Sequence, residues 1–202
     1  MAVVPDRPAH TREFRVRRMQ NWLVLGLTYA AMYMARYNFP LANKALSDTY
    51  GWDKAEVGAI ISLGTLVYGI AALFNGPIAD RLGGRRAMLI GACGAFVFNL
   101  MFGLGAYLGV LGTGPLLLGY LATTWTLNMY FQSYSALSLI KVNSGWFHVS
   151  ERGVFSAIFG SMIQSGRFLV FLLLATPLVI ALPWQWRFFI PAGIVALLTV
   201  ST

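Results

Sequence analysis

The chain has 202 residues, of which 57% are hydrophobic and only 11% are charged, and its mean hydropathy is +0.65. Soluble domains carry roughly a quarter charged residues, so this composition excludes an ordinary soluble protein and predicts an all-α protein embedded in a lipid bilayer. The net charge of +8 does not indicate a nucleic-acid partner, because the basic residues fall in short clusters between apolar runs, as they do in cytoplasmic loops.

Six apolar runs reach or approach the roughly 20 residues that a helix needs to cross the hydrocarbon core. They cover residues 21–43, 55–77, 87–110, 114–139, 153–181 and 186–202. A polar, arginine-rich stretch precedes them. We therefore predict two parts: a basic cytoplasmic segment over residues 1–20 and a six-helix transmembrane unit over residues 21–202.

The basic residues outside the spans predict the orientation. Of the fifteen Lys and Arg residues, ten fall on the side of the amino terminus, three on the other side and two inside spans. Because cytoplasmic loops are enriched in Lys and Arg, we expect the amino terminus in the cytoplasm. Only fifteen residues follow Arg187, and no basic anchor closes the last span, so the six-helix unit is expected to be half of a larger assembly.

Two arginines lie deep inside spans that contain no Asp or Glu. Arg36 belongs to the first span and Arg167 to the fifth, each about 21 to 22 Å from the cytoplasmic end of its helix at 1.5 Å per residue. A charge at this depth is costly and usually faces a cavity or a partner. Because a guanidinium matches the oxygens of phosphate and carboxylate, the pair predicts an anion pathway at one depth.

Other residues share a helix face with these arginines: Tyr29, Tyr33 and Pro40 with Arg36, and Gly160 and Gln164 with Arg167. The fourth span carries Thr124, Asn128 and Gln132 at successive i+4 steps, a polar stripe that is unfavourable in lipid and favourable toward a water-filled interior. The candidate substrate-binding residues are Arg36, Arg167, Tyr33, Asn128, Gln132 and Gln164.

Each candidate has a structural alternative. Asn128 and Gln132 could join neighbouring helices by hydrogen bonds. The tyrosines could be packing residues, and Arg36 could extend its side chain to the outer interface. Arg167 could likewise reach the interface or bond a carbonyl.

The loop between the second and third spans runs from Gly76 to Arg86 and contains Asp80 followed by Arg81, Arg85 and Arg86. Placed there in a six-span unit, it resembles the loop signature of the major facilitator superfamily, and Trp186-Arg187-Phe188 is also similar to that superfamily. The resemblance implies two six-helix halves around a site at the membrane midplane, of which this chain would be the amino-terminal half. The residues expected to form a conformational gate are Gly76, Asp80, Arg81, Gly83, Arg85, Glu151 and Arg152.

A narrower resemblance runs along the chain. The first span resembles the first helix of the organophosphate:phosphate antiporters, the glycerol-3-phosphate and hexose-phosphate carriers, through Tyr29-Ala30-Ala31, Tyr33, Arg36, Asn38-Phe39 and Leu41-Ala42. Further similar positions are Tyr68-Gly69, Leu127-Asn128, Phe131-Gln132, Trp146 and Glu151-Arg152-Gly153. The resemblance implies that Arg36 is the arginine that binds the substrate phosphate, with a partner in a seventh helix.

The chain departs from that family at three positions. Ala72 stands where the second helix would carry a lysine, and Ile163 stands where the fifth would carry a binding-site histidine. Arg167 replaces an expected small residue. The cationic charge of the cavity has therefore moved, so the substrates of the known carriers do not transfer directly to this chain.

The expected function is that of a secondary transporter of the bacterial inner membrane, exchanging an organic phosphate or related organic anion for inorganic phosphate by alternating access. The partners would be the small anion, the bilayer, and a carboxy-terminal half or second copy that completes the cavity. No cofactor is implied, since no GxxxxGK[ST] loop occurs. The alternatives are a non-transporting sensor of sugar phosphate and a carrier of a carboxylate. An enzyme is not expected, because no nucleophile, base or metal constellation is evident.

Overall fold

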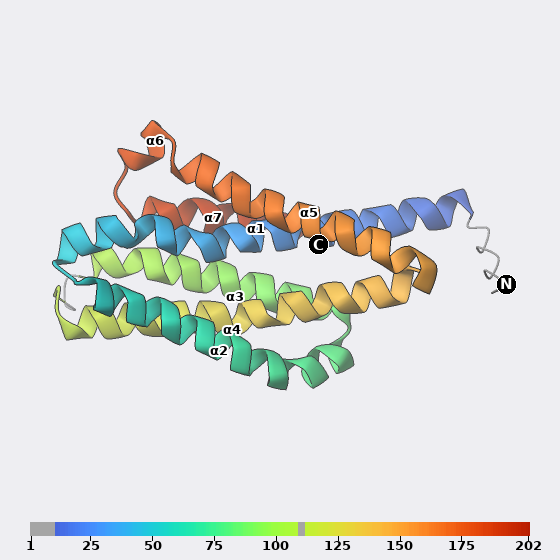
Figure 1. The fold of residues 1–202 in the computed structure, drawn as a ribbon, viewed down its shortest axis with the longest axis horizontal. Coiled ribbons are helices and arrows are strands. Elements are labelled where there is room, and N and C mark those ends of the chain that lie inside the picture. The colour runs from blue at the N-terminus through green and yellow to red at the C-terminus, as the bar shows by residue number, and fades with distance from the viewer. Residues whose placement is uncertain (1–10, 109–111) are drawn as a thin grey trace.

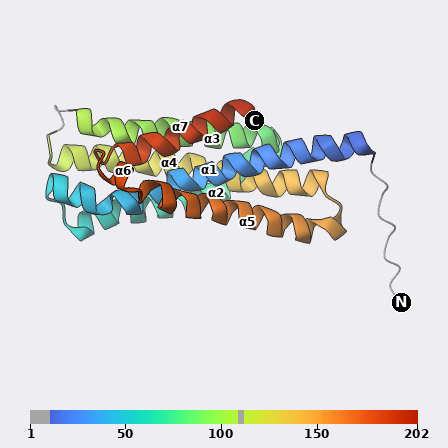
Figure 2. The same cartoon turned by 90° about the horizontal axis from the view of Figure 1, so that it is seen from above.

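The computed structural model describes residues 11–108 and 112–202, and these residues form helices and no strands. The helices are α1 (Arg12–Tyr50), α2 (Lys54–Leu82), α3 (Gly84–Leu104), the 3-10 turn η1 (Gly105–Tyr107), α4 (Pro115–Trp146), α5 (Val149–Leu174), the short α6 (Pro177–Ile180) and α7 (Trp186–Ser201). Figures 1 and 2 show the long helices side by side, with α1, α3 and α5 antiparallel to α2, α4 and α7.

Turn chemistry sets where the helices begin and end. Asp53 and Glu56 form a reciprocal capping box at the start of α2. Gly51 ends α1 and Gly83 separates α2 from α3, both with positive φ values of 71° and 82°. These are left-handed conformations that a side chain would strain. His148 and Glu151 form a second capping box at the start of α5.

The two ends of the bundle differ in chemistry. We call the end that carries Arg18, Lys141 and Arg152 the Arg-rich end and the opposite end the far end. At the far end a cluster of aromatic side chains is buried between α1, α3, α4 and α7; its members are Phe39, Phe102, Trp125, Trp184 and Phe188. Phe102 and Phe188 stack with ring centroids 4.2 Å apart. Burial of such large apolar surfaces holds the far end together.

Glycines let pairs of helices approach closely. A Cβ added at Gly91 or Gly94 of α3 would overlap Ser135 or Phe131 of α4, and one added at Gly166 of α5 would overlap the carbonyl of Ala30 in α1. In a membrane, helices associate through this kind of close packing, because lipid supplies no hydrophobic driving force. The α3–α4 and α1–α5 pairs are thereby fixed in register.

Three helices are long and apolar enough to cross a membrane by length and composition: α2, α3 continued through η1, and α5; α7 is a shorter apolar helix. The helices α1 and α4 have the length of a span and carry most of the buried polar side chains in the described ranges. Large apolar side chains on α2 and α5 are exposed, among them Leu66, Leu73 and Phe168. The chain is an all-α membrane protein in which five long helices and the shorter α7, in the described ranges, form one bundle.

The predicted fifth span, residues 153–181, is wrong at its end. The helix stops at Leu174, and a short helix starts at Pro177. A proline disfavours the helical conformation of the residue before it, and Thr176 is accordingly extended, with φ −65° and ψ 143°. At the other terminus α1 already begins at Arg12, so residues 12–20 of the predicted basic segment are helical and continuous with the first span. Residues 1–10 of that segment, and residues 109–110 of the predicted third span, lie outside the described residues.

Candidate anion-binding site

Arg36 lies in the middle of α1 with its guanidinium turned toward α2 and α4. Its Nε donates a 2.9 Å hydrogen bond to Oε1 of Gln132 on α4. Its Nη2 is buried and has no hydrogen-bond partner among the described residues. A buried donor without an acceptor is costly, and a charged one more so. The arrangement therefore leaves a donor open for an oxygen that the described protein atoms do not supply.

Two tyrosines flank the same guanidinium. Its Cζ lies 4.8 Å from the ring centroid of Tyr33 on α1 and 4.4 Å from that of Tyr68 on α2. Ring faces attract a cation and so hold the guanidinium without using its hydrogen-bond donors. Arg36 is thus positioned by side chains of three helices while keeping donors free.

A chain of buried amides runs behind Arg36. Gln132 donates to Oδ1 of Asn128 at 3.0 Å, Asn99 of α3 donates to the same oxygen at 2.9 Å, and Asn38 donates to Oδ1 of Asn99 at 2.8 Å. Asn99, Asn128 and Gln132 also donate to the carbonyl of Ala35 at 3.2 to 3.4 Å. All four amide side chains are 0% exposed. Because each amide group has a distinct oxygen and nitrogen side, the chain presents the oxygen of Gln132 to Arg36.

Solvent exposure increases along the predicted helix face of α1, from Tyr29 to Pro40. Tyr29 is buried against Tyr33, with ring centroids 5.2 Å apart, while Tyr33 and Arg36 are half-buried and Pro40 is exposed. Proline lacks the N–H that would bond the carbonyl four residues earlier, which here is that of Arg36 itself. The face therefore opens from a packed end at Tyr29 toward an exposed end at Pro40.

Arg167 approaches the same level of α1 from α5. It is exposed in the bundle, and its Cζ lies 4.7 Å from the ring centroid of Tyr37, the residue after Arg36. Tyr37 in turn stacks on Tyr33 with centroids 5.8 Å apart and an interplanar angle of 26°. The structure therefore places the guanidinium groups of Arg36 and Arg167 each over one ring of a stacked tyrosine pair.

No carboxylate of the described residues neutralises either arginine. The three ion pairs in the described ranges join Arg17 to Glu13, Arg18 to Glu151 and Lys141 to Asp80. Gln164, one turn before Arg167, is exposed. The site thus combines two unneutralised cations, tyrosine rings and amides, which is the chemistry of anion binding.

The amide candidates separate into two groups. Gln132 contacts Arg36 directly, whereas Asn128 lies behind Gln132 and joins α4 to α1 and α3. The alternative of a structural, helix-joining role therefore describes Asn128, and Thr124 bonds only to carbonyls of its own helix among the described residues. Gln132 both contacts Arg36 and joins α4 to α1 through the carbonyl of Ala35.

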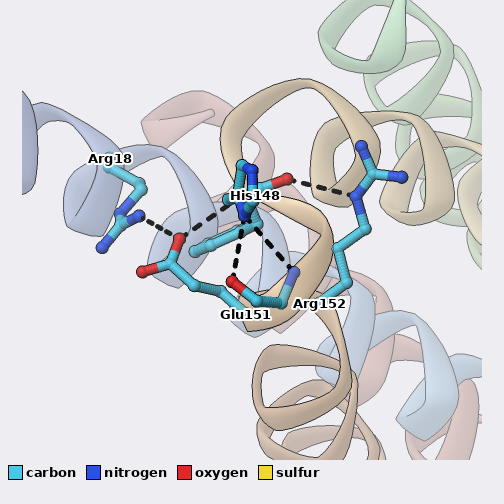
Figure 3. A network of polar contacts seen from close by, with 6 residues as sticks. Arg18, His148, Glu151 and Arg152 are labelled. Atoms are coloured by element: carbon cyan, nitrogen blue, oxygen red, sulfur yellow. Dashed lines mark hydrogen bonds and ion pairs between the residues drawn. The ribbon is translucent and has the colours of Figure 1, made fainter. Parts of the chain in front are cut away.

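At the Arg-rich end, Arg18 of α1 meets Glu151 of α5. Its Nη1 donates to Oε2 of Glu151 at 2.9 Å, and the guanidinium lies 5.0 Å from the ring centroid of Phe147 and 5.4 Å from that of Phe155. Figure 3 shows Arg18 and the backbone N–H of His148 converging on the Glu151 carboxylate. Arg152 caps the end of α4 by donating to the carbonyls of Phe147 and Ser144, at 3.1 and 2.8 Å.

The loop cluster pairs its acidic residue with a distant helix. Asp80 pairs with Lys141 of α4 at 3.0 Å, not with the arginines that follow it. Arg85 donates to the carbonyl of Thr202 at 2.8 Å, and Arg81 is exposed with no hydrogen bond or ion pair to a described residue. Gly83 has the positive φ that the tight reversal needs, whereas a Cβ at Gly76 would meet nothing. The cluster still joins helix ends, but through α2 and α4.

Sequence reasoning missed two residues of the site. Asn99 is an isolated amide in an otherwise apolar run, which by itself signals a buried polar contact in a membrane helix. Tyr37 lies one position outside the predicted face of the first span, so periodicity did not select it. Asn38 and Tyr68 entered only through the family resemblance.

Comparison with known proteins identifies related chains. The family model described as Major Facilitator Superfamily matches residues 25–201. The membrane sensor protein UhpC of Salmonella typhimurium is 24% identical over 92% of this chain and 39% of its own length. A probable hexose phosphate transport protein of Chlamydia trachomatis is 27% identical over 96% of this chain and 40% of its own. A probable L-galactonate transporter of Escherichia coli is 30% identical over 74% of this chain and 31% of its own.

The chain spans about 40% of the length of the first two of these relatives, UhpC and the chlamydial protein. Their names describe transporters and a sensor, and none of the three names an enzyme.

Proposed function

Because the chain belongs to the major facilitator superfamily, we propose that it forms the amino-terminal half of a secondary transporter that exchanges an organic phosphate, or a related organic anion, for inorganic phosphate. The observation that carries the proposal is the buried, unpartnered Nη2 of Arg36, held in a site without carboxylates. A phosphate oxygen is the acceptor that such a donor lacks, and the guanidinium fork suits it. Relatives named for hexose phosphate and glycerol-3-phosphate transport support the phosphate ester.

In this proposal, Arg36 binds the phosphate while Gln132 fixes the guanidinium. Tyr33 and Tyr68 hold its flat faces, and Asn128 positions Gln132 from behind. The substrate enters and leaves by alternating access, in which two halves rock about the site. We propose that the amino terminus is cytoplasmic and that the protein resides in a bacterial inner membrane, since the Arg-rich end carries the positive charge.

The Arg-rich end would act as the gate. Its ion pairs, Arg18–Glu151 and Asp80–Lys141, join the ends of α1 to α5 and α2 to α4. Charge pairs near the surface contribute little net stability and can exchange partners with water or with other charges. Because ion pairs hold the Arg-rich end together, it can open and close at a smaller cost in free energy than the far end, which buried aromatic side chains hold together. Gly76, Gly83, Arg81, Arg85 and Arg152 would belong to the same gate.

The cavity needs a second wall. Exposed Arg167 and Gln164 on α5, together with the half-buried Arg36, would face lipid in an isolated six-helix unit. We propose that a carboxy-terminal half, or a second copy of the unit, covers them. Transport by a purified monomer of these 202 residues alone would contradict this part of the proposal.

Two further functions are supported by particular relatives. A non-transporting sensor is supported by the similarity to UhpC, and a carboxylate carrier by the similarity to a protein named for L-galactonate, a sugar acid. Counterflow of labelled phosphate in liposomes that contain the protein separates the three. Exchange driven by internal phosphate esters supports the antiporter, and binding of esters without exchange supports the sensor. Exchange of a sugar acid with no response to phosphate supports the carboxylate carrier.

A further inference from the structure

We propose that Arg167 and Tyr37 form a second anion subsite, so that the substrate is an organic phosphate carrying another anionic group, such as a carboxylate, at its other end. This inference rests on the proposed function of Arg36 as the phosphate-binding residue. Four observations carry it: the position of Arg167, the absence of a neutralising partner, the tyrosine stack that links it to Arg36, and the glycine that brings α5 close to α1.

The first observation concerns where Arg167 points. Although it is exposed on α5, its guanidinium lies over the ring of Tyr37 on α1 and not out toward either end of the helix. The contact through a ring face uses none of its N–H donors. All five donors of Arg167 therefore remain available for an oxygen ligand.

The second observation is electrostatic. Arg167 has no hydrogen bond or ion pair to a described residue, and no Asp or Glu occurs in the predicted spans of α1, α2, α4 or α5 apart from the helix ends. A cation inside the hydrocarbon region is strongly unfavourable without a counter-charge. The repulsion between Arg167 and Arg36 adds to that cost where the dielectric constant is low. A ligand with two negative groups supplies a counter-charge to Arg167 and reduces the repulsion between Arg167 and Arg36.

The third observation separates the two cations. The guanidinium of Arg36 is turned toward α2 and α4 by Tyr68 and Gln132, whereas Arg167 comes from α5. The stacked pair of Tyr33 and Tyr37 links the two, with one guanidinium over each ring. Two anionic groups at different positions fit this arrangement better than one phosphate held by both arginines.

The fourth observation is a close approach that fixes this geometry. Gly166 lets the backbone of α5 touch the carbonyl of Ala30, and Arg167 is the next residue. Gln164, one turn earlier on α5, adds an exposed amide beside it. The subsite is therefore positioned by helix packing and not by a flexible loop.

The test compares two esters that differ only at one end: 3-phosphoglycerate has a carboxylate where glycerol 3-phosphate has a hydroxymethyl group. Binding of both, and of inorganic phosphate, is measured on the purified protein in nanodiscs, assembled with the carboxy-terminal half or second copy that completes the cavity, for the wild type and for Arg167→Leu. We expect the wild type to prefer 3-phosphoglycerate by about ten- to a hundredfold, the value of a hydrogen bond to a charged group. Arg167→Leu should abolish that preference and leave phosphate and glycerol 3-phosphate binding within about twofold.

Controls keep the outcomes distinct. Phe168→Leu, at the neighbouring exposed position, should change none of the three affinities. An unchanged preference in Arg167→Leu overturns the second subsite, and so does an equal loss for all three ligands, which would mean that both arginines hold one phosphate. If the wild type binds none of the three, the proposed function of Arg36 fails first and the subsite fails with it. Arg167→Leu replaces an exposed charge by an apolar side chain, so we expect it to fold in a membrane.

Discussion

Arg36 and Arg167 lie at the same level of the bundle, yet the protein holds them in opposite ways. Arg36 is fixed by a directional hydrogen bond to Gln132 and backed by a chain of buried amides from three helices. Arg167 touches one ring face and has no described hydrogen bond. The difference teaches that the bundle fixes the orientation of Arg36 and leaves the donors of Arg167 open; in the proposed site, Arg36 would supply geometry and Arg167 chiefly charge.

The first prediction tests this contrast by the same substitution at both positions. Lysine keeps the charge but loses the planar fork and the Nε–H. We expect Arg36→Lys to weaken phosphate binding by about a hundredfold, because it loses the Gln132 bond and a bidentate contact. Arg167→Lys should stay within about fivefold, because an ammonium group also binds a ring face. Isothermal titration with 3-phosphoglycerate measures both, and equal losses would remove the contrast.

The second prediction concerns the amide chain that makes the Arg36 site rigid. Asn99→Leu leaves the buried amide of Asn38 without its acceptor and Asn128 without one of its donors. Each unpaired buried polar group costs about 1 to 3 kcal/mol, so thermal unfolding in detergent should occur at a clearly lower temperature. Phosphate affinity should also fall about tenfold, because Asn128, the acceptor that holds Gln132, loses its hydrogen bond from α3 and is positioned less firmly.

Val97→Ala is the control for that variant, since Val97 is exposed on the same helix. It should leave both the unfolding temperature and phosphate affinity close to wild type. Normal phosphate affinity in a folded Asn99→Leu protein would show that Arg36 does not depend on the chain.

The third prediction separates the two arginines by moving one helix. Gly166→Ala puts a methyl group into the carbonyl of Ala30 and should push α5 away from α1. We expect the preference for 3-phosphoglycerate to drop several-fold while inorganic phosphate binding, which we assign to Arg36 in the proposed function, is little changed. Gly160→Ala on the same helix meets no atom within 4 Å and should behave as wild type in both assays. A drop of equal size in both variants would point to general helix effects.

The fourth prediction has the smallest expected effect on binding. Glu151→Gln removes the charge that pairs with Arg18 but keeps an oxygen for the cap of α5. Loss of such a partly exposed pair should lower stability by about 1 kcal/mol. Affinity at both arginines should be unchanged, while the rate of phosphate exchange shifts because the gate is altered. A large change in affinity would mean that the Arg-rich end contributes directly to the site.

Local composition was enough to predict much of the fold. The apolar runs, the two unneutralised arginines and the glycine-rich reversal at Gly83 are all features of neighbouring residues, and each appears in the structure near its predicted place. Thr176 and Pro177 also mark the end of the fifth helix in the sequence. The prediction missed this end because the residues after Pro177 are still hydrophobic.

The site required information from distant parts of the chain. Asn99 lies 61 residues from Asn38 and 29 from Asn128, and no local pattern predicts that the three amides meet. Asp80 likewise has Arg81 beside it in sequence but pairs with Lys141, 61 residues away. Helical side chains point radially, so adjacent residues on a helix face different neighbours.

The sequence by itself determined that this is a helical membrane protein with two arginines deep inside spans that contain no acidic residue. Whether a segment lies in lipid or in water depends on its own hydrophobicity and charge, so the spans can be predicted from each segment alone. Only the tertiary structure decided that Arg36 is held by Gln132 and Arg167 by Tyr37. Those partners depend on the register between helices, which close contacts such as Gly166 with Ala30 set across the bundle.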